Sequence, residues 1–278
     1  KNNVLEQVGA NDIFEHNTDT LNNQISQRYE RTQQVAEGNT TNIPTVIIAP
    51  DKTSRTEVAQ IVRDAKTEKG ELTGDEIGYG NLVDKQLSGH QMQHVSYFKQ
   101  GDVIRFSKSS PQIGVEKGAE HHVAAIDRKN NSLTLSGKDG YITVNLDRHT
   151  MTDAKAYQQE YRPLKMGDRL TFNEGIHANK SGTITDIGDR LFKIKFKGDD
   201  HSTTITPTRD RHFEYDFLNH SANGKEKQHA LVYWKGDIKH EDAVALYRQL
   251  PHKESITVYT DSKDGFRSAL DDSANQKL

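Results

Sequence analysis

The sequence contains no cysteine, which excludes a disulfide framework, a thiolate zinc site and a cysteine nucleophile. It also has no excess of positive charge, because 37 lysine and arginine residues face 40 acidic ones and leave a formal net charge of −3. Binding of nucleic acid through bulk charge alone is therefore excluded, and any such contact needs a local groove. No apolar run approaches the roughly 18 residues of a membrane span, and the start shows no signal-peptide pattern. We expect no insertion into a membrane.

What the chain does contain is enough material for about two folded domains, since it has 278 residues of which 32% are hydrophobic. It opens without methionine and in the middle of a pattern, which is typical of a piece of a longer protein. We therefore expect catalytic parts of the parent protein to lie outside this segment.

Both ends of the chain follow an α/β rhythm. Apolar positions at mostly helical spacing predict one or two amphipathic helices within residues 1–42. Apolar, β-branched runs predict buried strands, and each is followed by an amphipathic helix. The strands are expected at 45–49, 230–234 and 255–260, and the helices at 53–70, 241–250 and 264–272. Strand, loop and helix are the unit of a parallel sheet covered by helices.

Between residues 95 and 212 the hydrophobic period switches to two, and turn-forming residues separate the short runs. This pattern predicts a pair of small antiparallel β-barrels. An internal repeat supports the pair, because Gly101-Asp102-Val103-Ile104-Arg105-Phe106 returns as Gly167-Asp168-Arg169-Leu170-Thr171-Phe172. The expected organisation is a discontinuous α/β lobe of residues 1–95 and 213–278, interrupted by an all-β insertion at 96–212.

Motifs for nucleotide hydrolysis and metal binding are missing. No Gly-Lys is followed by Ser or Thr, so the segment lacks a phosphate loop and is not expected to hydrolyse ATP by itself. His90 and His94 have a spacing that could hold a metal on a helix, but no glutamate lies between them and no third ligand is evident. We predict neither a metal site nor a catalytic residue in this segment.

Three stretches resemble, in order, the second RecA-like domain of RecD-type superfamily 1 helicases. They are residues 45–63 (TVIIAPDKTSRTEVAQIVR), 218–224 (LNHSANG) and 244–248 (VALYR). The closing residues 255–270 are similar to the end of a helicase domain in the large conjugative relaxase-helicases of F-like plasmids, the MobF family. The resemblance implies the fold class: an α/β, RecA-like second helicase lobe with an inserted pair of small SH3-like barrels.

The sequence departs from the active helicase pattern. Asn223 stands where the family has glutamine, Leu218 and Glu226 where it has threonine, and Tyr247 where it has a small hydroxyl residue. The match is to the degenerate first helicase-like domain, which has lost its ATPase. The resemblance makes His220, Asn223, Gly224 and Arg248 vestigial motif residues, although Arg248 also fits a structural arginine on a helix. ATP, magnesium, the relaxase's divalent metal, strand nicking and ATP-dependent unwinding then belong to the parent protein, with no cofactor in this segment.

The resembling family carries an internal translocation signal in this region. The matching residues here are Gly167, Asp168, Arg169, Leu170, Thr171, Phe172 and Asn173, and they depart from the family's pattern at Thr171 and Asn173. A plainer reading is equally open, because a Gly-Asp turn that opens a strand is what any small barrel needs. Alternation places Leu170 and Phe172 on one face of the strand and Arg169 and Thr171 on the other, without saying which face meets solvent.

The resemblance implies two partners, the coupling ATPase of a type IV secretion system and single-stranded DNA. Candidate DNA-binding residues are Lys180, Lys193 and Lys195, with Phe192 as a stacking platform. The implied location is the cytoplasm of the donor bacterium, followed by export to the recipient. One rival interpretation is half of an active ATP-dependent helicase motor, and another is a structural spacer. Oligomeric state stays open.

Overall fold

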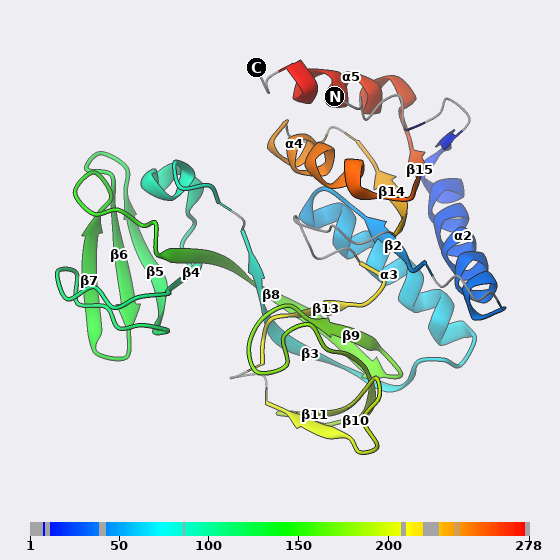
Figure 1. The fold of residues 1–278 in the computed structure, drawn as a ribbon, viewed down its shortest axis with the longest axis horizontal. Coiled ribbons are helices and arrows are strands. Elements are labelled where there is room, and N and C mark those ends of the chain that lie inside the picture. Colours follow the sequence, from blue (N-terminus) through cyan, green and yellow to red (C-terminus); the bar gives the residue numbers. More distant parts are fainter. Residues whose placement is uncertain are drawn as a thin grey trace.

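The computed structural model describes residues 8, 12–38, 43–85, 87–206, 210–218, 228–236, 238 and 240–275. This part of the chain is a mixed α/β structure with one parallel and two antiparallel sheets (Figure 1). None of its helices combines the length and the apolar character needed to cross a lipid bilayer.

The parallel sheet is assembled from both ends of the chain. Its four strands run in the order β1-β15-β14-β2, and every neighbouring pair is parallel. The strands are β1 (Ile13–Glu15), β2 (Thr45–Ile48), β14 (His229–Trp234) and β15 (Ser255–Thr260). The predicted strands at 45–49, 230–234 and 255–260 are confirmed. Ile13–Glu15 was expected in a helix and instead forms a short edge strand, because it pairs with β15 some 245 residues away.

Helices cover both faces of this sheet. Along β14, Leu231 and Tyr233 pack with α2 (Thr18–Gly38) and α3 (Lys52–Glu68). Val232 and Trp234 point to the opposite face and pack with α4 (His240–Gln249) and α5 (Lys263–Asn275). The result is a three-layer arrangement. Helix α3 begins at Asp51, whose Oδ1 accepts a hydrogen bond from the backbone N of Ser54 at 3.0 Å.

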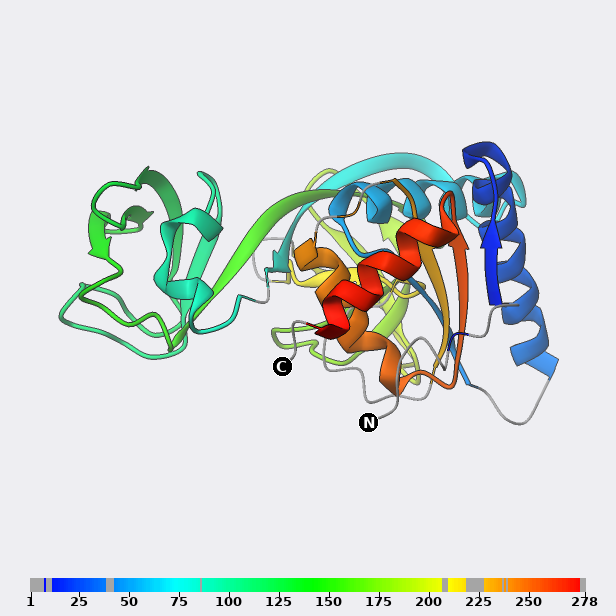
Figure 2. The same cartoon turned by 90° about the horizontal axis from the view of Figure 1, so that it is seen from above.

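The antiparallel strands form two β modules. The distal module stands away from the α/β layers (Figures 1 and 2) and contains β4 (Val103–Phe106), β5 (Glu120–Asp127), β6 (Ser132–Gly137) and β7 (Gly140–Asn145). The proximal module packs beside α3 in the order β12-β11-β10-β9-β13. Its strands are β9 (Arg169–Phe172), β10 (Ser181–Ile187), β11 (Phe192–Phe196), β12 (Thr203–Ile205) and β13 (Phe213–Tyr215).

A long ribbon of two strands connects the modules. Strands β3 (Thr73–Asp84) and β8 (Ala154–Met166) pair along almost their whole length. One end of β8 pairs with β4 in the distal module, and the other end leads into β9. Residues 73–84 had been assigned to the α/β lobe, yet they belong to this antiparallel sheet. Three glycines and three acidic residues hide the alternation of this stretch. The division into a lobe (1–95 and 213–278) and an insertion (96–212) stays a prediction.

The internal repeat corresponds to two turns with the same backbone geometry. Gly101 and Gly167 have φ of +89° and +94°, a region that favours glycine. In each turn the aspartate side chain accepts from the backbone N three residues earlier, from Lys99 at 2.8 Å and from Lys165 at 2.7 Å. Each aspartate is buried and forms an ion pair with a cation from another segment of the chain. Asp102 pairs with Lys85, and Asp168 pairs with Arg63. The repeat therefore encodes one structural turn used twice.

The two turns differ in crowding, and this difference predicts unequal responses to alanine. A Cβ at residue 167 would clash with the carbonyl oxygen of Glu71, whereas a Cβ at residue 101 would meet no atom within 4 Å. We expect Gly167→Ala to lower the free energy of unfolding by about 3 kcal/mol or more, and Gly101→Ala by only about 1–2 kcal/mol. Urea denaturation of both variants checks this, and equal losses would contradict the predicted clash.

Candidate functional site

The second residue of the predicted translocation signal, Asp168, is buried in an ion pair. It is 2% exposed and faces Arg63 of α3, which is 1% exposed. Arg63 Nε donates to Asp168 Oδ1 at 3.1 Å, and Arg63 Nη2 donates to Oδ2 at 3.1 Å. Burial raises the pKa of Asp168, and the Arg63 guanidinium opposes that rise. Asp168 thus joins the proximal module to α3 and is not accessible to a partner.

Further contacts complete the surroundings of Arg63. Its Nη1 donates to Glu76 Oε2 on β3 at 2.8 Å. Its guanidinium lies 5.3 Å from the ring centroid of Tyr215 on β13. One arginine of α3 therefore contacts the β3–β8 ribbon, the turn before β9 and the last strand of the proximal module.

The next residues of the segment alternate between core and solvent. Leu170 and Phe172 are buried within the proximal module. The Arg169 side chain is 56% exposed, and its Nε lies 3.1 Å from Asp216 Oδ2. Thr171 is half-buried and shares a hydrogen bond with Ser181, while Asn173 is exposed. The face left undetermined by the sequence is now assigned: the apolar pair packs inward, and Arg169 faces solvent.

Arg169 belongs to an outward face of the proximal module that spans three strands. Thr183 of β10 is the register partner of both Arg169 on β9 and Lys195 on β11. Lys193, two residues from Lys195, is exposed on the same side and forms an ion pair with Asp186 at 2.8 Å. Lys195 has no ion pair within the described ranges. Since carboxylates accompany two of the three cations, this outward face has only a modest positive field.

The DNA-binding candidates separate into exposed and buried residues. Phe192 is fully buried and lies edge-on to Tyr79, with ring centroids 5.2 Å apart, so its expected role as a stacking platform is wrong for this conformation. The alternation of Phe and Lys in β11 did not show which face of the strand packs against the core of the module. Lys180 is exposed but does not lie on the outward face. Its Nζ is 5.1 Å from the Phe196 ring centroid and 3.9 Å from Asp199 Oδ2.

Of the four vestigial helicase residues, only Arg248 falls within the described part of the chain, and only its backbone is described. His220, Asn223 and Gly224 lie outside the described residues. Arg248 falls in α4, and its side chain also lies outside the described part of the molecule. Their predicted roles stay predictions.

The carboxyl ends of the parallel strands, where α/β sheets commonly bind ligands, are occupied by contacts within the chain. Lys235 Nζ lies 2.5 Å from Glu57 Oε1. Both carboxylate oxygens of Asp261 accept from the backbone N of Gly236, at 3.0 and 2.9 Å. Glu15 accepts from the backbone N of Lys263 at 2.7 Å. These polar groups satisfy one another, whereas Asp51 Oδ2, just after β2 at the same edge, is buried without a hydrogen-bond partner among the described residues.

His90 and His94 flank a short 3₁₀ helix (Gln91–Gln93), and their ring centroids are 4.7 Å apart. Across the described residues, no group of three or more histidine, aspartate or glutamate side chains gathers in a way that could hold a metal ion.

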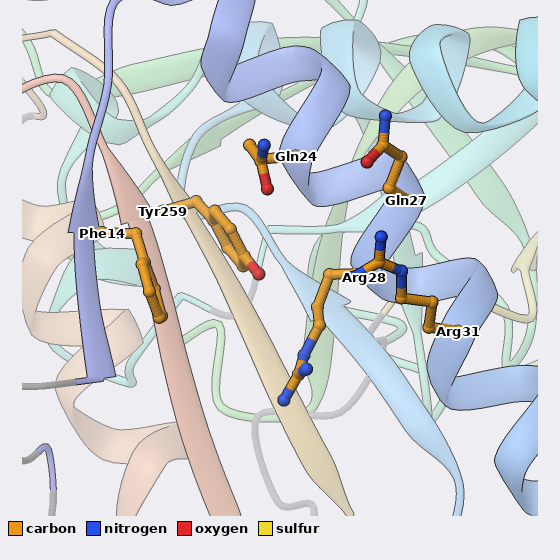
Figure 3. Close-up of a pocket in the computed structure, with 6 residues that line it drawn as sticks. All are labelled: Phe14, Gln24, Gln27, Arg28, Arg31 and Tyr259. Atoms are coloured by element: carbon orange, nitrogen blue, oxygen red, sulfur yellow. The ribbon is translucent and has the colours of Figure 1, made fainter.

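A feature that sequence reasoning missed lies at the free edge of the parallel sheet. A shallow pocket of about 180 Å³ is lined by Phe14, Gln24, Gln27, Arg28, Arg31 and Tyr259 (Figure 3). Two arginines three residues apart with no acidic residue one helical turn away were a usable sequence signal. The position of Phe14 in this pocket could not be predicted, because residues 13–15 were expected to be part of a helix.

Comparison with known proteins identifies no family. No protein-family model matches the chain, and no curated protein does. Among solved structures, unliganded Pif1 from Bacteroides sp. aligns with 12% identity over 99% of this chain and 53% of its own, with a TM-score of 0.19. Pif1 helicase from Bacteroides in complex with ADP-AlF3 and ssDNA aligns with 12% identity over 94% and 54%, with a TM-score of 0.22. The chain spans about half the length of these structures, and such TM-scores are too low to assign a shared fold.

The buried ion pair predicts a large cost for removing its cation. We expect Arg63→Gln to lower the free energy of unfolding by about 3 kcal/mol or more, because Asp168 is then left buried without its partner. Arg169→Gln removes the exposed cation of a pair whose carboxylate, on Asp216, is only 18% exposed, and is expected to cost less, about 1–2 kcal/mol. Urea denaturation of the two variants tests the contrast, and similar values would show that Arg63 is not essential to the packing.

A buried histidine predicts acid sensitivity of the distal module. Neither ring nitrogen of His121 has a hydrogen-bond partner within the described ranges, and the ring packs edge-on to Phe106. Burial lowers the pKa of His121, so the unfolded chain binds this proton more readily than the folded one. The folded state therefore has its full stability, as far as His121 is concerned, above about pH 6.5. The free energy of unfolding declines as the pH falls below that value, because the unfolded chain takes up the proton first.

His121→Gln is expected to flatten this decline, measured as the free energy of unfolding between neutral and mildly acidic pH. His122→Gln, which changes the exposed neighbour, is the matched control and should retain the decline. His212, whose pKa burial also lowers, contributes a remaining slope in both variants. An unchanged slope in His121→Gln would remove His121 from the explanation.

Proposed function

We propose that the chain is a binding module, without catalysis of its own, within a conjugative relaxase-helicase. In this proposal the coupling ATPase of a type IV secretion system recognises the β modules, and the parent protein passes from the donor's cytoplasm to the recipient. The α/β layers are interpreted as the second RecA-like lobe of a helicase-like domain without ATPase, and the β modules as the SH3-like barrels that the sequence resemblance implies.

The observation that carries the proposal is the exposure pattern of residues 167–173. Gly167 cannot accept a side chain, Asp168 is paired internally, and Leu170 and Phe172 belong to the core. A receptor can reach Arg169, Asn173 and, in part, Thr171. This pattern favours recognition of a folded surface over recognition of a linear peptide.

The surface available around Arg169 is the outward face of the proximal module. Thr183 and Lys195 extend it across β10 and β11 in register with Arg169. A contact made there would depend on the module being folded, because the three side chains come from different strands. Under this proposal, the buried members of the signal act by holding the exposed ones in place.

Single-stranded DNA is the second proposed partner. Lys193 and Lys195 on the outward face are the exposed cations that favour it, and Lys180 lies nearby without sharing that face. Because the chain as a whole is slightly acidic and Lys193 is paired with Asp186, such a contact is expected to be weak and salt-sensitive.

The rival motor interpretation rests on the retained Arg248 within its helicase-like stretch. It is tested by restoring the missing first lobe and measuring ATP turnover stimulated by single-stranded DNA. Turnover that disappears in Arg248→Ala would favour the motor over the binding module.

The secretion proposal is tested by fusing the chain to a reporter and scoring export from donor to recipient cells. Arg169→Ala and Asn173→Ala are expected to fold normally and to reduce export, because they change only the exposed part of the signal. Arg169→Lys retains the charge and should restore part of the export, and Arg190→Ala is the control for loss of an exposed arginine elsewhere.

Circular dichroism and thermal melting accompany each export measurement. Arg63→Gln is expected to reduce melting temperature and export together, since it weakens the support of the signal. A folded Arg169→Ala variant that is exported as well as the control would overturn the assignment. Loss of export only in variants that fail to fold would instead favour the structural-spacer interpretation.

A further inference from the structure

The sheet of the distal module ends in a strand whose outer edge is open. Strand β7 is the last in the order β3-β8-β4-β5-β6-β7, and β6 is its one partner among the described strands. It contains no charged residue, and it lies on the side of the distal module that is turned away from the α/β layers (Figure 1). Tyr141 is 75% exposed and Thr143 is also exposed, so this edge is accessible from solvent.

Alternate residues of β7 direct their backbone groups outward from the open edge. Leu146 N donates to Asn131 O at 2.9 Å, which fixes the alternation of bonded and non-bonded pairs along the β6–β7 ladder. Ile142 therefore bonds to β6, whereas the N–H and C=O groups of Tyr141 and Thr143 point away from it. No described residue forms a hydrogen bond with these four groups. The open edge thus presents two donors and two acceptors in a row.

The other ends of the three described sheets are short, charged or covered. Strands β1, β12 and β13 have three residues each. Strand β2 is extended sideways by Leu218, which forms a bridge with Ile47. Strand β3 carries three acidic residues, and its Leu82 N donates to Arg211 O at 2.6 Å. Proteins block unwanted strand pairing in these ways, so an open edge of six uncharged residues is suited to pairing with another strand.

We propose that two copies of this chain associate by antiparallel pairing of their β7 strands, which joins their six-stranded sheets into one. A two-fold axis between the two Ile142 residues places Tyr141 of one copy opposite Thr143 of the other. Each such pair exchanges two backbone hydrogen bonds, so the two pairs satisfy all four outward groups of each copy. The association uses no residue of the outward face of the proximal module and is independent of the proposed recognition in secretion.

The composition of β7 favours a second copy as its partner. A strand that adds to this edge must itself favour the extended conformation, and Ile142, Thr143 and Val144 are β-branched. Because the strand is uncharged, pairing with itself brings no like charges together. It also places the exposed ring of Tyr141 beside Thr143 of the other copy, and pairs of an aromatic and a β-branched residue stabilise sheets.

Sedimentation equilibrium of the whole chain over a range of protein concentrations tests the association. Two six-residue strands make a small contact, so we expect a reversible equilibrium between the 31.4 kDa chain and its dimer. Thr143→Pro removes an outward N–H from each copy and leaves the bonds to β6 intact. It is expected to weaken association at least about tenfold, because two of the hydrogen bonds between the copies are lost.

A second variant tests the open edge through charge. Thr143→Lys places a cation on this edge and is also expected to weaken association. Thr204→Lys is the matched control, because it adds the same charge to an exposed position of β12, the end strand of the proximal sheet. It should leave the association unchanged. Circular dichroism confirms that each variant is folded.

The register is tested with single introduced cysteines, since the chain has none of its own. In the proposed pairing the two Ile142 residues form a non-hydrogen-bonded pair with Cα atoms about 4.5 Å apart. Ile142→Cys should therefore form a disulfide between copies in the presence of oxidised glutathione. The two Thr143 residues are diagonal neighbours about 7–8 Å apart, so Thr143→Cys should crosslink much more slowly.

Four outcomes would overturn the proposal. The first is the mass of a single chain at every concentration. The second is a dimer that Thr143→Pro leaves unchanged, or that Thr143→Lys and Thr204→Lys weaken equally. The third is faster crosslinking of Thr143→Cys than of Ile142→Cys, which would indicate a different register. The fourth is a monomer that binds a β-branched extended peptide through the open edge, with binding lost in Thr143→Pro, which would assign the edge to a strand of another protein.

Discussion

The arrangement of this molecule depends on a charged pair that has been removed from water. Taking Arg63 and Asp168 out of solvent is costly unless their hydrogen-bonding groups are satisfied, and here several neighbours contribute. Glu76 accepts from Arg63, the Lys165 backbone donates to Asp168, and the Tyr215 ring lies beneath the guanidinium. These partners come from the ribbon, the turn and the last strand of the proximal module, so the pair joins α3 to all three where they pack together.

The same pair explains why a short segment can combine structural and recognition roles. Asp168 and its turn secure the start of β9, and alternation along β9 then places Leu170 inward and Arg169 outward. The equivalent turn at Gly101-Asp102 has Lys85 as its cation and opens β4 in the distal module. Because the turn recurs, its residues are explained by folding alone, and the exposed side chains after it are the ones that a partner can reach.

Sequence reasoning succeeded where the deciding interactions are local. The strand at Thr45–Ile48 and the helix after Asp51 follow from a β-branched run and a capping residue a few positions apart. It failed where the partner is distant. Arg63 and Asp168 are 105 residues apart, and nothing in a helical pattern marks Arg63 as buried. Strand β3 was missed because its glycines suppress the alternation and its partner β8 follows only after four intervening strands.

The candidate site shows the same limit. Period two correctly separated Leu170 and Phe172 from Arg169 and Thr171, but it could not say which pair was buried. For β11 the same ambiguity led to the wrong use of Phe192, whose ring packs against Tyr79 from the ribbon. The pocket around Phe14 needed the pairing of β1 with β15, which joins the two ends of the chain.

The β3–β8 ribbon has a mechanical consequence. Its hydrogen-bonded strands continue from the distal module to the turn at Gly167, so the distal module is mounted on a semi-rigid beam and not on a flexible tether. At the junction, Glu174 beyond β9 contacts Arg105 of β4 and Lys155 of β8, bracing the beam from the side. A force applied to the distal module would therefore be transmitted along the ribbon to its other end, where Arg63 pairs with Asp168. A flexible linker would not transmit it.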